Sequence, residues 1–413
     1  MVYVFLMLRG FKGGCKDQQA RLLLEESITL KLWLDQLGLE LLPASTLSEH
    51  LNAVSNATRG AIEQTQLRYI LEQGLDDFKK CFVDSTAVAA NTDRPTDSTL
   101  MVRLVWRIGA CGGHLHKLGL PDMDQVGLQQ QQDELRRLGQ QILFLHGKTR
   151  AQARRKKLYF QLIKRVRRLR KRLLRDLAPV CQHVAQRSDL PPSRRLLAEA
   201  ALAFIADDLT GLEQAANVCE RRMMDEEKVP QDEKIISLSD PDASFIVKGG
   251  WNTLVGYRPQ LARSGRGFVS ALKLPRGNAA DSPQLFTMVN AHITNTGVRP
   301  SLVSVDDGYS SEQGRAEVLH LGVKVVSISG AKGKKLIEAA QWKSQPYRQA
   351  RAERSAIESL VFTLKQGFEF GELMRRTQEN VLAEMLEKIL AYNISQMIRV
   401  RKRLTEEAQP AAA

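Results

Sequence analysis

Residues Leu302 to Tyr309 read LVSVDDGY, an apolar run that ends on an acid. Residues Cys81 to Thr86, CFVDST, repeat the arrangement far upstream. Short apolar runs bounded by turn residues predict buried strands. Side chains that bind ligands in α/β sheets lie beyond the carboxyl ends of the strands. Asp84 and Asp306 therefore stand where a site would form, although Asp-Asp-Gly is also a common turn sequence and Asp307 is a rival to Asp306.

A third acid, Glu358, lies on a predicted helix. Arg354, Glu358 and Lys365 are spaced i, i+4 and i+11, so on a helical wheel they fall within about 40° of one another. They border an apolar stripe made by Ile357, Leu360, Val361 and Leu364. This carboxylate, flanked by two cations, could reach a metal ion. The alternative is a surface ion pair between Arg354 and Glu358.

Size and charge suggest several units and a polyanionic partner. The chain has 413 residues, of which 43% are hydrophobic, and its formal net charge is +14. This length predicts two or three units with sizeable cores. An excess of positive charge favours nucleic acid as a partner, with an anionic membrane surface as the second choice.

The order of predicted elements gives an α/β domain with an interruption. We expect helices over 1–78, compatible with a helix-turn-helix for DNA binding or dimerisation or with an ordinary helical hairpin. Residues 79–120 begin the α/β domain, 121–230 are a helical insertion after its first strand, and 231–413 complete it with C-terminal helices. An independent middle domain is the alternative. Later strands are expected at 245–247, 267–274, 285–289, 302–305 and 323–328.

The insertion contains a strongly basic helix. Residues 148–175 hold fourteen Lys or Arg and no Asp or Glu. Phosphates would neutralise such a run, and affinity would then fall with salt. A solvated face and a helix lying on lipid are the alternatives. Lys164 and Arg165 belong to the same basic run. The candidate DNA-binding residues are Arg154, Arg155, Lys156, Lys157, Arg167, Arg168, Arg170, Lys171 and Arg172.

Nothing in the sequence predicts membrane insertion or a disulfide framework. The opening apolar stretch 1–8 is too short to span a bilayer, and no cleavage-like site follows it. The five cysteines are scattered and form no C-x-x-C pair. We therefore expect reduced thiols and a cytoplasmic protein.

Taken together, these motifs resemble the bacterial insertion-sequence transposases of the DDE type. The resemblance covers roughly residues 20–400. It includes the region of Lys248-Gly249-Gly250 and the stretch 322–335, whose general sequence fits the family. Its other matching residues are Asp84-Ser85-Thr86 with Asn91, Pro95-Thr96-Asp97-Ser98, Asp306-x-Gly308-Tyr309 and Arg354-x3-Glu358-x6-Lys365. Arg351 stands where members of this group often carry a tyrosine.

The resemblance implies a catalytic domain with an RNase H-like mixed sheet flanked by helices. Asp84, Asp306 and Glu358 would bind two Mg²⁺ or Mn²⁺ ions, one activating the nucleophile and one stabilising the leaving oxygen. Arg354 and Lys365 would hold phosphates of double-stranded DNA. The resemblance also allows a homodimer on the DNA. Two other hypotheses remain: a non-catalytic DNA-binding remnant of a transposase, and an α/β phosphotransferase that uses Asp84 without Glu358.

Overall fold

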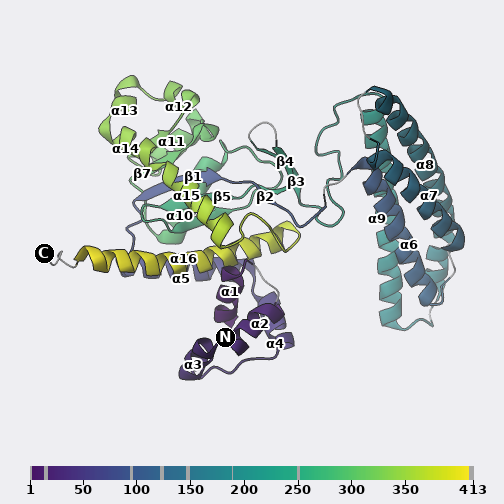
Figure 1. Cartoon of the computed structure of the whole chain (residues 1–413), viewed down its shortest axis with the longest axis horizontal. Coiled ribbons are helices and arrows are strands. Elements are labelled where there is room, and N and C mark those ends of the chain that lie inside the picture. The colour runs from purple at the N-terminus through teal and green to yellow at the C-terminus, as the bar shows by residue number, and fades with distance from the viewer. Residues whose placement is uncertain are drawn as a thin grey trace. The chain divides into compact units, whose positions relative to one another are not determined.

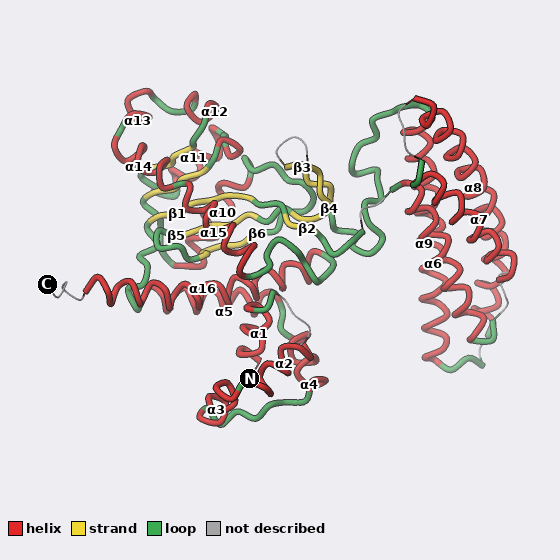
Figure 2. The backbone as a smooth tube through the Cα atoms, viewed as in Figure 1, coloured by secondary structure: helices red, strands yellow, loops and turns green. Residues whose placement is uncertain are grey.

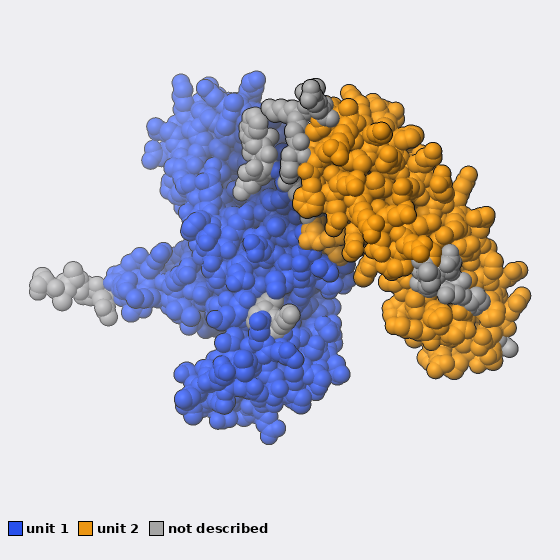
Figure 3. Space-filling model, turned by 45° about the vertical axis from the view of Figure 1, so that its right-hand side comes forward, with its two compact units in different colours: residues 1–92, 242–413 blue, residues 93–241 orange. Residues whose placement is uncertain are grey.

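The computed structural model describes residues 2–13, 17–93, 96–120, 125–145, 149–187, 189–248 and 252–408. The chain forms two compact units (Figure 3). Unit 1 combines residues 1–92 with 242–413, and unit 2 is residues 93–241. Pro95, Gly249 and Gly250, which contribute to the resemblance, lie outside the described residues.

A five-stranded mixed sheet forms the centre of unit 1. Its strand order is β6-β5-β1-β7-β8, and Figure 1 labels β5, β1 and β7 of this sheet. β1 pairs antiparallel with β5 and parallel with β7, β5 pairs antiparallel with β6, and β7 pairs parallel with β8. The strands are β1 (Lys80–Ser85), β5 (Gln260–Ser264), β6 (Val269–Lys273), β7 (Leu302–Val305) and β8 (Val325–Ile328). This open mixed sheet, flanked by helices, confirms the predicted RNase H-like fold class.

Alternating side chains direct the two faces of this sheet to different helices. Cys81 and Val83 of β1 are buried with α10 and α11 on one face. Phe82, between them, is buried with α15 and α16 on the other. The period of two along a strand explains this division. The helices are α10 (Gln284–Thr296), α11 (Glu312–His320), α14 (Gln345–Glu353), α15 (Ser355–Gly367) and α16 (Gln378–Ala408).

The strand expected at 285–289 is wrong, because these residues belong to helix α10. Leu285, Met288, Val289 and His292 are buried on one face of that helix. Their spacing of i, i+3, i+4 and i+7 is helical, and a short apolar run alone does not separate a buried strand from a buried helix. Gly297 ends the helix with a left-handed φ of 71°.

A second, three-stranded sheet has the order β2-β4-β3. It contains β2 (Val88–Ala89), β3 (Ser244–Lys248) and β4 (Asn252–Tyr257). Gly256 of β4 pairs with Ala89 on one side and Ser244 on the other. A Cβ at Gly256 would lie 1.9 Å from the carbonyl oxygen of Val88, so this close strand contact requires glycine.

Unit 2 is built from helices, drawn in red in Figure 2. These helices share one hydrophobic core. They are α6 (Asp97–Lys117), α7 (Gln125–Leu143), α8 (Thr149–Gln186) and α9 (Pro192–Met223). The unit begins at residue 93, whereas the prediction placed its start at 121. The reason is packing: Leu104, Val105 and Ile108 of α6 are buried in the same core as α8 and α9. Residues 93–120 therefore do not belong to the unit with the mixed sheet.

The N-terminal helices pack onto the last helix. Gly10 of α1 lies so close to α16 that a Cβ there would approach the Glu387 carbonyl oxygen to 2.2 Å. Phe5 and Leu6 share a core with Leu390 of α16. This region is helical, as expected; its helix-turn-helix role stays a prediction. Its helices are α1 (Val2–Phe11), α2 (Asp17–Glu26), α3 (Ile28–Gln36), α4 (Ala44–Ala53) and α5 (Asn56–Glu72).

Three short helical segments complete unit 1. They are η1 (Asp307–Tyr309), α12 (Ala331–Lys335) and α13 (Ala339–Lys343). Among the helices of the described ranges, none has the length and apolar character needed to cross a bilayer.

Candidate active site

Asp84 and Asp306 are brought to the same edge of the mixed sheet. β1 and β7 run parallel, with Phe82 paired to Ser304. Asp84 and Asp306 each lie two residues further along, at equivalent positions and with the same strand parity. Both acids are fixed locally, since the Ser85 amide donates to Asp84 Oδ1 at 2.7 Å and the Gly308 amide donates to Asp306 Oδ1 at 2.9 Å.

Burial and neighbouring charges raise the pKa of both aspartates. Burial, and after it the nearby charge of Asp306, raises the pKa of Asp84 to about 6. The pKa of Asp306 is also raised, first by burial and then by Asp281. Arg354 acts in the opposite direction on both groups. Carboxylates that repel one another and are partly withdrawn from water favour a cation between them.

Asp307 has a different, structural position. Its carboxylate accepts the backbone N–H groups of Gly333 at 2.8 Å and Lys332 at 3.2 Å, in the first turn of α12. These backbone hydrogen bonds lower its pKa. Because the Asp307 carboxylate is hydrogen-bonded to α12, Asp306 is the acid of the Asp306–Asp307 pair that lies near Asp84.

Glu358 forms the ion pair that its helical spacing allows. Arg354 Nη2 lies 2.7 Å from Glu358 Oε1, and the Glu358 side chain is 57% exposed. Within the described ranges, no three or more His, Cys, Asp or Glu side chains are grouped so that they could hold one metal ion. Arg354 thus lies near both aspartates while its side chain holds Glu358.

The remaining residues of the glutamate motif also have internal partners. The ammonium of Lys365 donates to the Ala87 carbonyl oxygen, just after β1, at 2.9 Å. The guanidinium of Arg351 stacks 3.9 Å from the centre of the Trp342 ring and donates to the Trp342 carbonyl at 3.2 Å. Arg351 therefore stabilises the chain around α13 and α14.

A fourth acid, Asp281, belongs to this site and was not predicted from the sequence. It is buried, and its carboxylate accepts hydrogen bonds from Gln260 at 2.9 Å and from Arg258. Arg258 also donates to Ser85 Oγ at 3.1 Å, next to Asp84. Gln260 accepts the hydroxyl of buried Tyr309. Asp281 therefore connects the ends of β1 and β7 through two bridging side chains, and no sequence motif marks it.

Hard divalent cations prefer oxygen ligands such as these carboxylates. Asp84 and Asp306 fit such an ion by their donor atoms, their proximity and their mutual repulsion. Glu358 could join them by exchanging its ion pair with Arg354 for the metal.

The basic helix α8 divides into two sets of cations. Six basic residues of α8, five of them predicted to bind DNA, have partners inside unit 2 or on α8 itself, and most of these partners are acidic. For example, Lys156 lies 2.6 Å from Glu226, Arg167 lies 2.7 Å from Glu220, and Arg170 lies 2.9 Å from Glu213. The other three are Arg155, which donates to the Leu145 carbonyl, Arg165, which pairs with Glu134, and Arg172, which pairs with Asp176.

The other set forms an exposed stripe along α8, which we call the basic stripe. On a helical wheel these residues fall within about 100°, and the stripe is about 30 Å long. Each of them is exposed, and within the described part of the chain no ion pair to them is seen. The basic stripe consists of Arg154, Lys157, Lys164, Arg168, Lys171 and Arg175.

Comparison with known families agrees with this geometry. Residues 240–394 match the family model for the transposase DDE domain, a range that includes Asp281, Asp306 and Glu358. No curated protein and no solved structure matches the chain. The match begins at the small sheet and extends into α16, so it covers the part of unit 1 that follows unit 2. Over residues 240–394 this chain is therefore similar to the DDE domain of transposases.

Proposed function

We propose that this chain is a transposase that cleaves DNA strands and transfers the ends of a bacterial insertion sequence in a Mg²⁺-dependent reaction. The observation that carries the proposal is the pairing of Asp84 with Asp306 at the carboxyl edge of an RNase H-like sheet. The matched transposase DDE domain supports the same reaction class.

Each residue of the site has a distinct task in this proposal. Asp84, Asp306 and Glu358 hold the metal ions, with Mn²⁺ as a substitute for Mg²⁺. When bound, these ions supply positive charge that stabilises phosphodiester cleavage. Arg354 binds a substrate phosphate once Glu358 has left it. Lys365 contributes charge at the same edge, and Asp281 positions the strand ends that carry the two aspartates.

The change required of Glu358 is small in energy. An exposed ion pair at i, i+4 contributes only about 0.2–0.5 kcal/mol. We infer that a side-chain rotation brings Glu358 to the aspartates, while the buried residues Ile357 and Leu360 keep α15 in place. A phosphate arriving at Arg354 would replace the carboxylate that Arg354 gives up.

Double-stranded DNA is the proposed partner of unit 2. This unit contains 27 Lys or Arg and 19 Asp or Glu, a net charge of +8. Acids within the unit compensate many of these cations, and the basic stripe on α8 remains available for phosphates. Such contacts are independent of base sequence and sensitive to salt.

The test is strand cleavage on a supercoiled plasmid that carries the gene for this chain with its flanking DNA. With Mg²⁺ or Mn²⁺, the chain should nick the plasmid, and Asp84→Asn, Asp306→Asn and Glu358→Gln should each reduce nicking at least about 100-fold. DNA affinity, measured by a mobility shift, should change little.

Asp307→Asn is the matched control, because it removes the neighbouring carboxylate that caps α12. It should retain cleavage under conditions where the protein is folded. Loss of cleavage in Asp307→Asn together with full activity in Asp306→Asn would refute the assignment of the site.

A second candidate function is a non-catalytic DNA-binding protein. The observation that favours it is the ion pair of Glu358 with Arg354, which holds the third acid away from a shared metal site. This hypothesis predicts salt-dependent DNA binding without metal-dependent nicking by the unaltered chain.

A further inference from the structure

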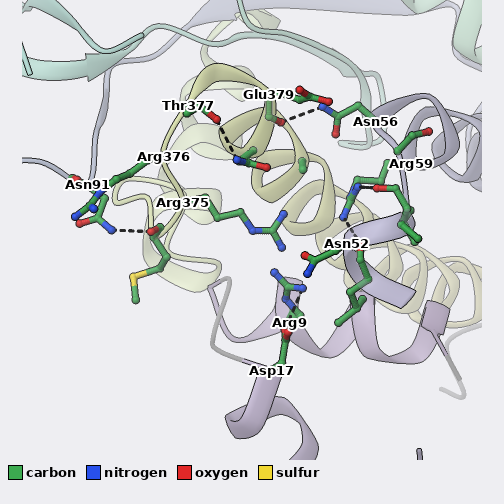
Figure 4. A pocket seen from close by; sticks show the side chains of 17 residues that line it. Arg9, Asp17, Asn52, Asn56, Arg59, Asn91, Arg375, Arg376, Thr377 and Glu379 are labelled. Carbon is green, nitrogen blue, oxygen red and sulfur yellow. Dashed lines mark hydrogen bonds and ion pairs between the residues drawn. The ribbon is translucent and has the colours of Figure 1, made fainter. Parts of the chain in front are cut away.

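A polar cavity of about 810 Å³ lies in unit 1, where the N-terminal helices meet the start of α16. Figure 4 shows the side chains of Arg9, Arg59 and Arg375 directed toward one region beside Asn52. Arg376 also lines the cavity, so four guanidinium groups come from α1, α5 and the segment before α16. The cavity is separate from the edge of the sheet that carries Asp84 and Asp306.

Three of these arginines share one buried acid. Glu387 of α16 lies 2.8 Å from Arg59, 2.9 Å from Arg375 and 3.5 Å from Arg9. The Glu387 side chain is fully buried behind the lining. Because one carboxylate carries one charge, three guanidinium groups around it leave positive charge directed to the cavity.

The acids at the cavity do not cancel this charge. Asp17 and Glu379 are the acidic lining residues, and Asp17 pairs with Arg9 at 3.2 Å. With Glu387 included, four arginines face three carboxylates. The cavity therefore keeps a net positive charge before any ligand enters.

Buried hydrogen-bonding groups at this cavity lack partners. The Arg9 side chain is only 9% exposed, and its Nε has no hydrogen-bond partner. Asn56 Oδ1 is also buried without a partner, although the amide nitrogen of Asn56 donates to the Glu379 carbonyl at 2.9 Å. Leaving a buried polar atom unpaired has a free-energy cost, because the atom has lost its hydrogen bonds to water. A ligand that accepts from Arg9 and donates to Asn56 would remove both costs.

Two helix N-termini add to the positive potential. The cavity is lined by Ser55 and Asn56 at the start of α5, and by Thr377 and Glu379 at the start of α16. First-turn N–H groups favour anions. Thr377 has a φ of 70°, an unusual conformation for a β-branched residue, which turns the chain into α16 at the cavity wall.

We propose that this cavity binds one nucleotide of a DNA strand, with its phosphate held by Arg9, Arg375 and Arg376. Its volume is that of a site for a nucleotide-sized molecule rather than for a lone phosphate ion. Arginine forks match the geometry of phosphate oxygens, and the amides of Asn52, Asn56 and Asn91 can bond base or sugar atoms. The choice of DNA as the source of the nucleotide rests on the proposed function, whereas the preference for an anion does not.

The experiment measures binding of 2′-deoxyadenosine 5′-monophosphate to the full chain by calorimetry, at low salt and without divalent metal. The monophosphate should bind at least about tenfold more tightly than deoxyadenosine or inorganic phosphate. A short single-stranded oligonucleotide should displace it. Equal binding of the monophosphate and inorganic phosphate would overturn the nucleotide assignment, and failure of the oligonucleotide to compete would overturn the DNA assignment.

Variants at exposed positions separate binding from folding. Arg376→Gln removes one cavity cation, whose only described bond is to the Asn91 carbonyl at 2.9 Å, and should weaken binding about tenfold. Asn52→Asp adds a negative charge and should weaken binding as well. Arg68→Gln, on the exposed face of α5, removes the same charge outside the cavity and should leave binding unchanged. Equal losses in Arg376→Gln and Arg68→Gln would overturn the proposal.

This measurement is independent of catalysis. Binding of the monophosphate together with absence of plasmid nicking would contradict only the proposed transposase reaction. Nicking together with absence of nucleotide binding would contradict only the cavity.

Discussion

At the scale of single residues, the candidate site combines acids in opposite electrostatic situations. Asp84 and Asp306 are partly buried beside one another, so their pKa values are raised. Asp307, adjacent in sequence, accepts backbone N–H groups, so its pKa is lowered. The fold therefore opposes the ionisation of the first two acids and favours the ionisation of the third.

This contrast predicts opposite effects on stability. The folded-state pKa of Asp84 is about 6, above its ordinary value, so the folded chain loses stability as pH rises from about 4 to about 6. Asp84→Asn should remove this penalty. In metal-free buffer at pH 7.5 it should stabilise unit 1 by about 1–3 kcal/mol, and the gain should vanish near pH 4. Thermal unfolding followed by circular dichroism checks this.

Asp307→Asn is the comparison of opposite sign. Its depressed pKa means that the ionised carboxylate adds stability at neutral pH and loses this contribution as the solution is acidified. The substitution should therefore lower the unfolding temperature at pH 7.5. A stabilising effect of Asp307→Asn equal to that of Asp84→Asn would contradict the environments described for these acids.

The sequence predicted part of this site for a clear reason. Asp84 and Asp306 follow apolar runs, and parallel strands place such positions at one edge. Asp281 follows no strand and opens no recognisable motif. It acts through Arg258 and Gln260, whose proximity arises only when β5 pairs with β1.

At the scale of elements, α8 divides its cations between pairs within unit 2 and the exposed basic stripe. Acids on α7 and α9 pair with several of its arginines. The sequence showed the basic run but not these partners, because Glu134 and Glu220 are 31 and 53 residues from the arginines they bind. The predicted set of DNA contacts is therefore larger than the set left exposed.

We expect the basic stripe to set the salt dependence of DNA binding. The triple substitution Lys164→Gln, Arg168→Gln and Lys171→Gln should weaken binding to duplex DNA. It should also reduce the slope of log affinity against log salt by about 3, since each phosphate contact contributes about 0.9. Fluorescence anisotropy between 50 and 200 mM NaCl measures this slope.

The control is a variant of the paired set on the same helix. Arg167→Gln with Arg170→Gln removes two positive charges that bind Glu213 and Glu220. This change should lower the stability of unit 2 by about 0.2–1 kcal/mol for each pair and should alter the slope little. The role of the stripe would be refuted if the paired variant changed the slope as much per charge as the stripe variant does.

At the scale of the whole molecule, the two units have separate cores. Leu162, Val166 and Leu169 of α8 are buried with residues of α6, α7 and α9. The sequence placed a helical insertion here, but its boundary at 121 missed α6, because only tertiary packing assigns that helix to unit 2.

Residues 93–241 should therefore fold when produced alone. We expect a helical circular dichroism spectrum and one cooperative thermal transition. Leu162→Ala, a core substitution, should lower stability by about 2–5 kcal/mol. Leu196→Ala, at a position 68% exposed, should have little effect. A gradual melt without a transition, or equal effects of the two substitutions, would show that unit 2 depends on the rest of the chain.

The small sheet explains how the mixed sheet tolerates so large an interruption. Ala89, before unit 2, and Ser244, after it, pair with Gly256 from opposite sides. The points where the chain leaves unit 1 and returns to it are therefore two strand spacings apart, about 10 Å. Lengthening a connection whose ends stay close adds little entropic cost. During evolution a helical unit could therefore be gained, replaced or lost between β2 and β3, while the edge of the mixed sheet that carries both aspartates keeps its shape. A different unit at this position would change the surface available for DNA without changing the two aspartates.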